Sequence, residues 1–216
     1  MTGISKPPII GVLKETQLGE RRVALVPADA RRLTSRARIF IESGAGDAAG
    51  FPDRDYLEVG AAIVQRPTIL DQSDGVLAIH APADLSRLKM GVLLISLGGR
   101  DVGVVEVARA RYIPHLGLER LPHIPSARSM DALASQSRTG GQKPPAASRR
   151  WSRNMRALLE HLITAEARLQ LRFDDPITMG LLGAEVVQGD AAERRHVRER
   201  ARDSREMQNR RTVVLH

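Results

Sequence analysis

Short apolar runs of strand length recur through the first part of the chain, and amphipathic or capped stretches separate them. Nearly continuous apolar runs predict buried strands, and the stretches between them predict helices. The expected strands are Ile9–Leu13, Arg38–Glu42, Ala61–Val64, Gly75–His80, Val92–Leu97 and Tyr112–Leu116. The expected helices are Pro27–Ser35, Asp53–Val59 and Val102–Ala110. Buried strands that alternate with helices indicate an α/β domain, a doubly wound parallel sheet covered on both faces.

The pattern changes after Gln136. Ser137–Pro145 has the composition of a linker, and we assign the domain to 1–136, a linker to 137–150 and a mostly helical or disordered basic extension to 151–216. Within the extension, Asp174–Pro176 favours a second helix that continues to about Gln188. An apolar stripe of helical period also follows the linker, formed by Trp151, Met155, Leu158, Leu159, Leu162 and Ile163.

Composition excludes several classes of protein. The chain has 216 residues, 42% of them hydrophobic, but only 3% aromatic, so the core must rest on aliphatic side chains. There is no cysteine, which excludes disulfides, thiolate catalysis and cysteine-ligated zinc. No apolar run is long enough to span a membrane, and the N-terminus lacks the pattern of a secretory signal. These features predict a cytoplasmic protein.

The net charge of +8 is distributed unevenly. Residues 1–136 have 17 basic and 15 acidic side chains, whereas residues 137–216 have 16 and 10. Three interpretations of the arginine-rich stretch Asp190–Arg211 stay open. The first, which we favour, is a solvated, partly disordered helix. The second is a patch for nucleic acid or an acidic partner, and the third is the product of a shifted reading frame. Aromatic residues do not interleave with the arginines, so nucleic acid is not favoured.

The glycine-rich loop Ser43–Gly50 invites comparison with a phosphate-binding turn. A dinucleotide fingerprint requires a strand, a tight turn and a helix N-terminus in register. The strand is present, but the helix after the loop is short and begins only at Asp53. We therefore interpret the loop as a structural turn.

Several segments resemble the alanine dehydrogenase and pyridine-nucleotide transhydrogenase family. The resemblance covers about residues 9–136 and is closest to the NAD(H)-binding α subunit of proton-translocating NAD(P)+ transhydrogenase. It is carried by Ile10–Glu15, Gly19–Pro27, Glu42–Gly46, Phe51–Asp53, Val59–Ala61 and Ser126–Gln136.

The alanine dehydrogenase branch of the family is disfavoured by its own chemistry. That branch has a substrate lysine on the strand similar to Gly75–His80, where this chain has Ala78, and a catalytic histidine after the next strand. Ser96–Gly99 offers no histidine there, so the acid–base group is missing. Arg22 matches an arginine of the opening motif and is either a ligand or a surface charge. We interpret His80 as a structural residue.

The transhydrogenase branch implies a cofactor-ordering loop of arginine, glutamine and aspartate. In this chain His123, Arg128 and Asp131 take these positions, and Ala134 replaces the serine at the end of the loop. Only the aspartate is retained, and an arginine in place of glutamine offers donors only. The resemblance assigns cofactor contact to His123, Arg128 and Asp131, whereas the alternative is a helix start capped by Ser129.

The resemblance implies hydride transfer between NAD(H) and NADP(H) coupled to proton translocation. NAD is the implied cofactor, and the membrane and NADP-binding subunits are the implied partners, with a homodimer as a further option and a peripheral place at the inner membrane face. After Gln136 we find no G-x-G-x-x-G turn, so we expect a truncated or divergent relative that binds NAD weakly and is not catalytic alone. The alternatives are a non-catalytic dimerisation or interaction domain and a decayed or frameshifted product. We predict neither a catalytic residue nor a metal site.

Overall fold

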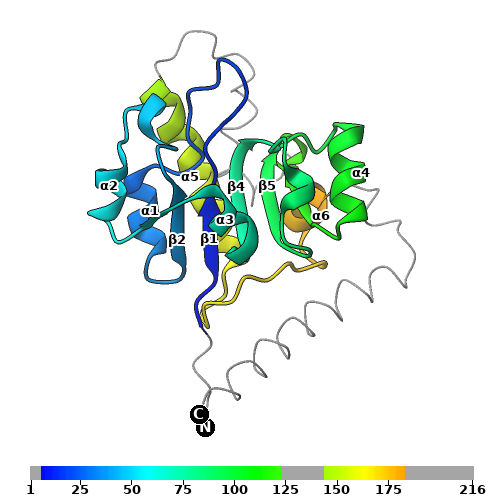
Figure 1. The fold of residues 1–216 in the computed structure, drawn as a ribbon. Helices are drawn as coiled ribbons and strands as arrows, with labels where there is room; N and C mark the ends of the chain where they lie inside the picture. Colours follow the sequence, from blue (N-terminus) through cyan, green and yellow to red (C-terminus); the bar gives the residue numbers. More distant parts are fainter. Residues whose placement is uncertain (1–5, 123–143, 183–216) are drawn as a thin grey trace, which may run out of the picture.

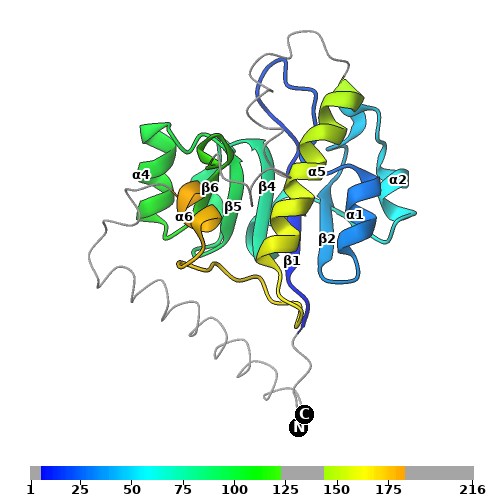
Figure 2. The same cartoon turned by 180° about the vertical axis from the view of Figure 1, so that it is seen from behind.

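The computed structural model describes residues 6–122 and 144–182 (Figures 1 and 2). Its centre is one six-stranded sheet in which all neighbouring strands are parallel, in the order β3-β2-β1-β4-β5-β6. The strands are β1 (Ile9–Val12), β2 (Arg38–Glu42), β3 (Ala62–Val64), β4 (Gly75–His80), β5 (Leu93–Leu97) and β6 (His115–Gly117). The predicted doubly wound parallel sheet is confirmed.

Helices cover both faces of this sheet (Figures 1 and 2). On one face, α3 (Arg66–Gln72) and α4 (Val102–Ala110) pack over one apolar core. On the other face lie α1 (Pro27–Leu33), α5 (Pro144–Leu162) and α6 (Pro176–Leu182), and this core also includes Tyr56 of α2 (Asp53–Leu57). Single 3₁₀ turns occur at Asp47–Ala49, Leu85–Arg87 and Leu118–Arg120. The strands are therefore buried on both sides, which explains their continuous apolar sequences.

Helix α5 crosses one face of the sheet next to β1 and lies in front of the strands in Figure 2. It begins at Pro144, inside the segment 137–150 that we assigned to a linker, because proline is tolerated in the first turn of a helix. All six positions of the predicted apolar stripe are buried in the core of the sheet, from Trp151 to Ile163. The stripe prediction is correct, and α5 shares its core with the strands of the preceding domain.

Polar contacts also connect α5 to the start of α1. Ser148 Oγ accepts a hydrogen bond from Val23 N at 3.2 Å, and Ser152 Oγ accepts one from Val26 N at 2.9 Å. The Ser152 hydroxyl donates to Asp29 Oδ2 at 2.6 Å, and Arg156 Nε donates to Asp29 Oδ1 at 2.8 Å. Asp29 is buried, so its charge requires these partners.

Helix α6 is joined to α5 through its first turn. Asp175 Oδ2 accepts hydrogen bonds from Thr178 N and Thr178 Oγ1, at 2.8 and 2.7 Å, and it lies 2.8 Å from His161 Nε2 at the end of α5. The predicted start at Asp174–Pro176 is therefore right. The described part of the helix ends at Leu182, and the rest of the predicted helix, with the segment Asp190–Arg211, lies outside the described residues.

Candidate functional site

The strand order reverses between β1 and β4, and ligands of doubly wound sheets bind outside the carboxyl ends of the strands at such a point. The side chains that follow β1 and end β4 therefore define the candidate site. The segment after β1 contributes Glu15, Glu20 and Arg22, and β4 ends at His80. Trp151 reaches the same place from α5.

Glu15 closes the end of β4. Its Oε1 accepts a hydrogen bond from Ile79 N at 2.6 Å, and its Oε2 accepts one from His80 N at 3.3 Å. The carboxylate is 6% exposed. It therefore fixes the segment that follows β1 against the neighbouring strand.

Arg22 is held from two sides. Its Nε and Nη2 donate to the two oxygens of Glu20 at 2.8 and 2.5 Å, and its guanidinium carbon lies 5.5 Å from the centre of the Trp151 ring. Burial raises the pKa of Glu20, but the hydrogen bonds and charge of Arg22, together with His80, outweigh burial, so this pKa lies below its ordinary value. The sequence left Arg22 as either a ligand or a free surface charge. These contacts hold its side chain in place near the end of β4, so it is not a free surface charge.

His80 lies between two carboxylates. Its Nδ1 is 3.4 Å from Glu15 Oε2 and 3.6 Å from Glu20 Oε2. Within the part of the chain that the structure describes, this buried atom has no hydrogen-bond partner. The switch point between β1 and β4 thus gathers two acids, one arginine and one histidine, whose charges contact one another within the chain.

A second ion network links the ends of β1 and β2. Arg66 donates to both oxygens of Asp84, at 2.9 and 2.7 Å, and to Glu42 Oε2 at 2.9 Å. Glu42 Oε2 also accepts from Lys14 N at 2.8 Å. The hydrogen bond from Arg66 lowers the pKa of Asp84. Because every one of these groups has a partner within the chain, the network holds loops together rather than a ligand.

The donors at the start of the glycine-rich loop are satisfied internally. Asp53 Oδ1 accepts from Gly44 N and Asp53 Oδ2 accepts from the Ser43 hydroxyl, both at 2.9 Å. A carboxylate at this position would repel a phosphate. The geometry supports the interpretation of the loop as a structural turn.

The N-terminus of α1 does not fit a dinucleotide either. A pyrophosphate in a doubly wound domain is held by free backbone N–H groups at the start of a helix. Here the N–H groups of Val23 and Val26, which precede the helix, are used by Ser148 and Ser152 of α5. These two N–H groups are therefore not available to a phosphate.

One buried pair was missed by sequence reasoning. His115 Nε2 lies 2.9 Å from Ser96 Oγ, and the Ser96 hydroxyl donates to Leu97 O at 2.8 Å, so the imidazole is the donor of the pair. Burial lowers the pKa of His115 to about 4. Ser96 is fully buried, which excludes attack on an external substrate. The two residues are 19 apart in sequence and meet only because β5 and β6 are neighbours.

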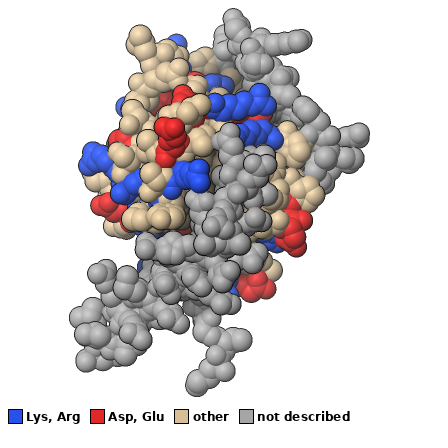
Figure 3. Space-filling model, turned by 90° about the vertical axis from the view of Figure 1, so that its right-hand side faces the viewer, with Lys and Arg blue, Asp and Glu red and all other residues tan. Residues whose placement is uncertain are grey.

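The predicted cofactor residues His123, Arg128 and Asp131, with Ala134, lie outside the described residues. Within residues 6–122 and 144–182, no group of three or more histidine, aspartate or glutamate side chains could hold a metal ion. The same residues contain no helix that is long and apolar enough to cross a membrane. On the side seen in Figure 3, Lys and Arg side chains are interspersed with Asp and Glu, unlike the continuous basic surface of a nucleic-acid interface.

Comparison with known proteins identifies relatives of the N-terminal part of the chain. Residues 11–139 match the family described as "Alanine dehydrogenase/PNT, N-terminal domain". The chain is 31% identical over 140 residues to NAD(P) transhydrogenase subunit alpha of Cereibacter sphaeroides. This match covers 62% of this chain and 27% of that protein. The subunit alpha of Haemophilus influenzae gives the same identity, length and coverage. Among solved structures, the transhydrogenase from Sinorhizobium meliloti superposes with a TM-score of 0.56 at 25% identity, covering 60% of this chain and 40% of that one.

Proposed function

Because the chain belongs to the alanine dehydrogenase/PNT N-terminal domain family, we propose that it is an α-subunit-like component of an NAD(P)+ transhydrogenase that is not catalytic alone. The observation that carries the proposal is the identity of 31% to transhydrogenase α subunits over 62% of the chain. The matched region spans 27% of each of those relatives. The reaction, hydride transfer between NAD(H) and NADP(H), therefore requires parts of those relatives that lie outside the matched region.

In this proposal the described domain positions groups beside the cofactor rather than holding it. Val26 N, just before α1, and Gly44 N of the glycine-rich loop have acceptors within the chain, which supports weak or absent binding of NAD by these residues. NAD(H) contact is assigned by resemblance to His123, Arg128 and Asp131. The membrane and NADP-binding subunits are the proposed partners, on the cytoplasmic side of the membrane.

Calorimetric titration of the full chain with NADH tests the first half of the proposal. We expect no binding in the low micromolar range, because the N–H groups of Val23, Val26 and Gly44 already have acceptors within the chain. ADP-ribose, which has the pyrophosphate without nicotinamide, is the matched control ligand. Tight binding of both would show a phosphate site that this reasoning lacks.

The second half is tested by hydride transfer from NADH to a thio-NADP acceptor in the presence of the NADP-binding subunit. The triple variant His123→Arg, Arg128→Gln and Ala134→Ser matches the family loop, with Asp131 retained. Positioning is effective only when the cofactor is already held. The variant should therefore stay inactive unless an intact family cofactor domain is grafted after Gln136, and turnover without the graft contradicts the proposal.

The sequence also left open a non-catalytic dimerisation or interaction domain and a decayed or frameshifted product. A frameshifted product is opposed for residues 144–162 by the side chains of α5. Ser148, Ser152 and Arg156 contact specific partners on α1 and the segment before it, and all apolar positions of the stripe are buried.

A further inference from the structure

The segment between β1 and α1, residues 13–26, is anchored at both ends. Near its start, Glu15 accepts hydrogen bonds from the backbone of β4, and at its end Val26 N donates to α5. Between these anchors the chain forms a loop, dark blue in Figure 1, that extends beyond the ends of the strands. We name residues 16–22 the β1–α1 loop. Leu18 in this loop is fully exposed.

The β1–α1 loop is attached to the rest of the domain through two side chains. Within the part of the chain that the structure describes, the side chains of residues 16–19 are exposed and make no hydrogen bond or ion pair. Glu20 holds Arg22, and its Oε2 lies 3.6 Å from Nδ1 of His80 at the end of β4. Arg22 lies over the ring of Trp151 on α5. The position of the loop therefore depends on the charges at His80.

The charges around His80 do not balance while its imidazole is neutral. Its Nδ1 lies 3.4 Å from Glu15 Oε2 and 3.6 Å from Glu20 Oε2, and these carboxylates are only 6% and 8% exposed. Arg22 balances one of them, so one negative charge is left over. A protonated imidazole has a donor at both ring nitrogens and a positive charge, and it removes the excess. The side chain of His80 is 29% exposed, so a proton reaches it from solvent.

Charged groups on the neighbouring elements have other contacts. Arg66 of α3 is paired with Asp84, and Glu119, which follows β6, accepts hydrogen bonds from the backbone of the loop after β5. The ammonium group of Lys14 lies at the glycine-rich loop. Among residues 6–122 and 144–182, the two carboxylates described above are therefore the ones within 4 Å of His80.

We propose that protonation of His80 closes the β1–α1 loop onto the end of β4 and that deprotonation releases it, so that access to the switch point of the sheet depends on pH. Imidazole is the side chain that ordinarily changes charge between pH 5 and 8. Its charged form attracts Glu20 from the loop and Glu15 from the fixed end, whereas its neutral form leaves a poorly solvated charge unpaired. Protonation of histidine at a contact between two elements is a known kind of switch. The proposal does not depend on the transhydrogenase reaction.

The test uses a nitroxide on the loop. The chain has no cysteine, so Leu18→Cys gives a single labelling site at a side chain without contacts. Electron paramagnetic resonance of the full chain separates an immobile component, the closed loop, from a mobile one. From pH 6 to pH 8 we expect the ratio of mobile to immobile label to rise about fivefold, as for an ion pair at the protein surface. A label on Ser35→Cys, at an exposed site after α1, should not respond.

Two substitutions of His80 separate its charge from its shape. His80→Gln cannot be protonated and should give the same spectrum at both pH values, whereas His80→Lys stays positive and should keep the label immobile at pH 8. His161→Gln is the matched control, because His161 also pairs with a carboxylate, Asp175, but at the other end of α5. It should retain the response of the label.

A measurement without label or substitution covers the case in which the variants do not fold. Release of the loop withdraws Arg22 from the ring of Trp151, the one tryptophan of the chain, so quenching of its emission by acrylamide should increase from pH 6 to pH 8. Equal mobility of the label at both pH values, a response that persists in His80→Gln or disappears in His161→Gln, or quenching that does not change with pH overturns the proposal.

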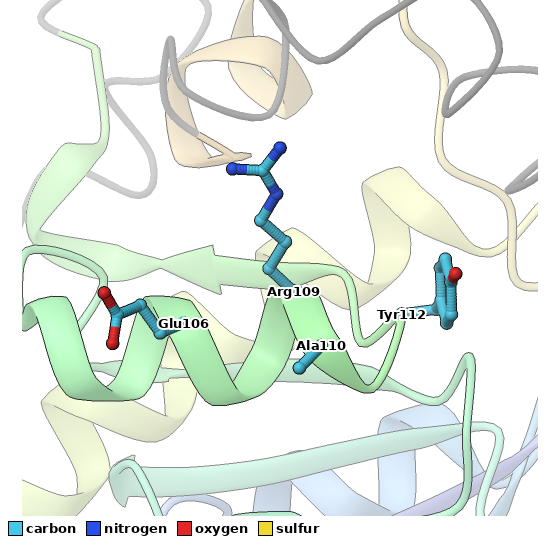
Figure 4. Close-up of a pocket in the computed structure, with 4 residues that line it drawn as sticks. All are labelled: Glu106, Arg109, Ala110 and Tyr112. Carbon is cyan, nitrogen blue, oxygen red and sulfur yellow. The ribbon is translucent and has the colours of Figure 1, made fainter.

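The one hollow in the described residues offers no alternative. It has a volume of about 340 Å³ and is lined by Glu106, Arg109, Ala110 and Tyr112 at the end of α4. Figure 4 shows that these side chains point in different directions rather than toward a common centre. This surface therefore carries no proposal.

Discussion

The attachment of α5 to the domain can be tested by removing one oxygen atom. Ser152→Ala deletes a hydroxyl that accepts from Val26 N at 2.9 Å and donates to Asp29 Oδ2 at 2.6 Å. Ser152 is fully buried, so water does not replace either partner. The substitution leaves almost no cavity, and the result therefore reports the hydrogen bonds.

The expected cost follows from the two groups that lose a partner. A buried N–H without an acceptor costs about 1–3 kcal/mol, and a hydrogen bond to a charged group contributes about 1.5–3 kcal/mol. Arg156 Nε still donates to the other oxygen of Asp29, which moderates the second loss. We expect Ser152→Ala to lower the free energy of unfolding by about 2–4 kcal/mol.

Urea denaturation followed by tryptophan fluorescence is the assay. The chain has one tryptophan, Trp151, which is 1% exposed and lies on α5 itself, so its emission reports whether the helix is packed. Ser35→Ala is the control, because Ser35 is exposed, and such changes stay within about 0.5 kcal/mol. Equal midpoints for wild type and Ser152→Ala, or the emission of a solvated indole in the native protein, would refute the packing of α5 described above.

Three further predictions concern stability. The pKa of His115 is lowered by burial to about 4, so the unfolded chain binds a proton at a higher pH than the folded chain does. As the pH falls from about 6.5 to 4, this difference lowers the free energy of unfolding by about 3 kcal/mol. His115→Gln should flatten that part of the pH–stability curve. Burial raises the pKa of Asp175, but hydrogen bonds from Thr178 and His161 lower it to about 2; its contribution of about 2 kcal/mol is present above about pH 4 and is lost between pH 4 and 2, so Asp175→Asn should remove this acid-limb dependence. A Cβ on Gly11 would lie 2.5 Å from Ser73 Oγ and closer still to Ile69 Cγ2; Gly11→Ala should therefore cost about 1–3 kcal/mol in thermal or urea denaturation, and an unchanged midpoint would contradict this close packing.

Elements with a strong local signal were predicted well from the sequence. The bounds of β2, β4 and α4 agree with the predicted segments Arg38–Glu42, Gly75–His80 and Val102–Ala110. In the two strands the signal is a continuous apolar run, and in α4 it is the capping aspartate before an apolar stretch. These features are local, so one sequence is sufficient to find them.

Elements with weak local signals were missed or displaced. Helix α3 was not predicted, because its seven residues bury only Ile69 and Leu70 and show no stripe of two turns. Strand β6 was predicted from Tyr112 but begins at His115, since Tyr112 adopts a left-handed conformation after α4. The polar contacts at the site were also invisible, because Glu15 and Ile79, which share a hydrogen bond, are 64 residues apart.

The distance along the chain between α5 and its partners has a consequence for biosynthesis. During translation β1, β2 and β4 emerge from the ribosome more than sixty residues before α5, so one face of the nascent sheet lacks the cover of α5 for several seconds. Ile10, Val12 and Leu77, which belong to that face in the finished domain, are then exposed to other chains. A nascent polypeptide of this kind is a substrate for ribosome-associated chaperones, and its yield in cells should depend on their supply.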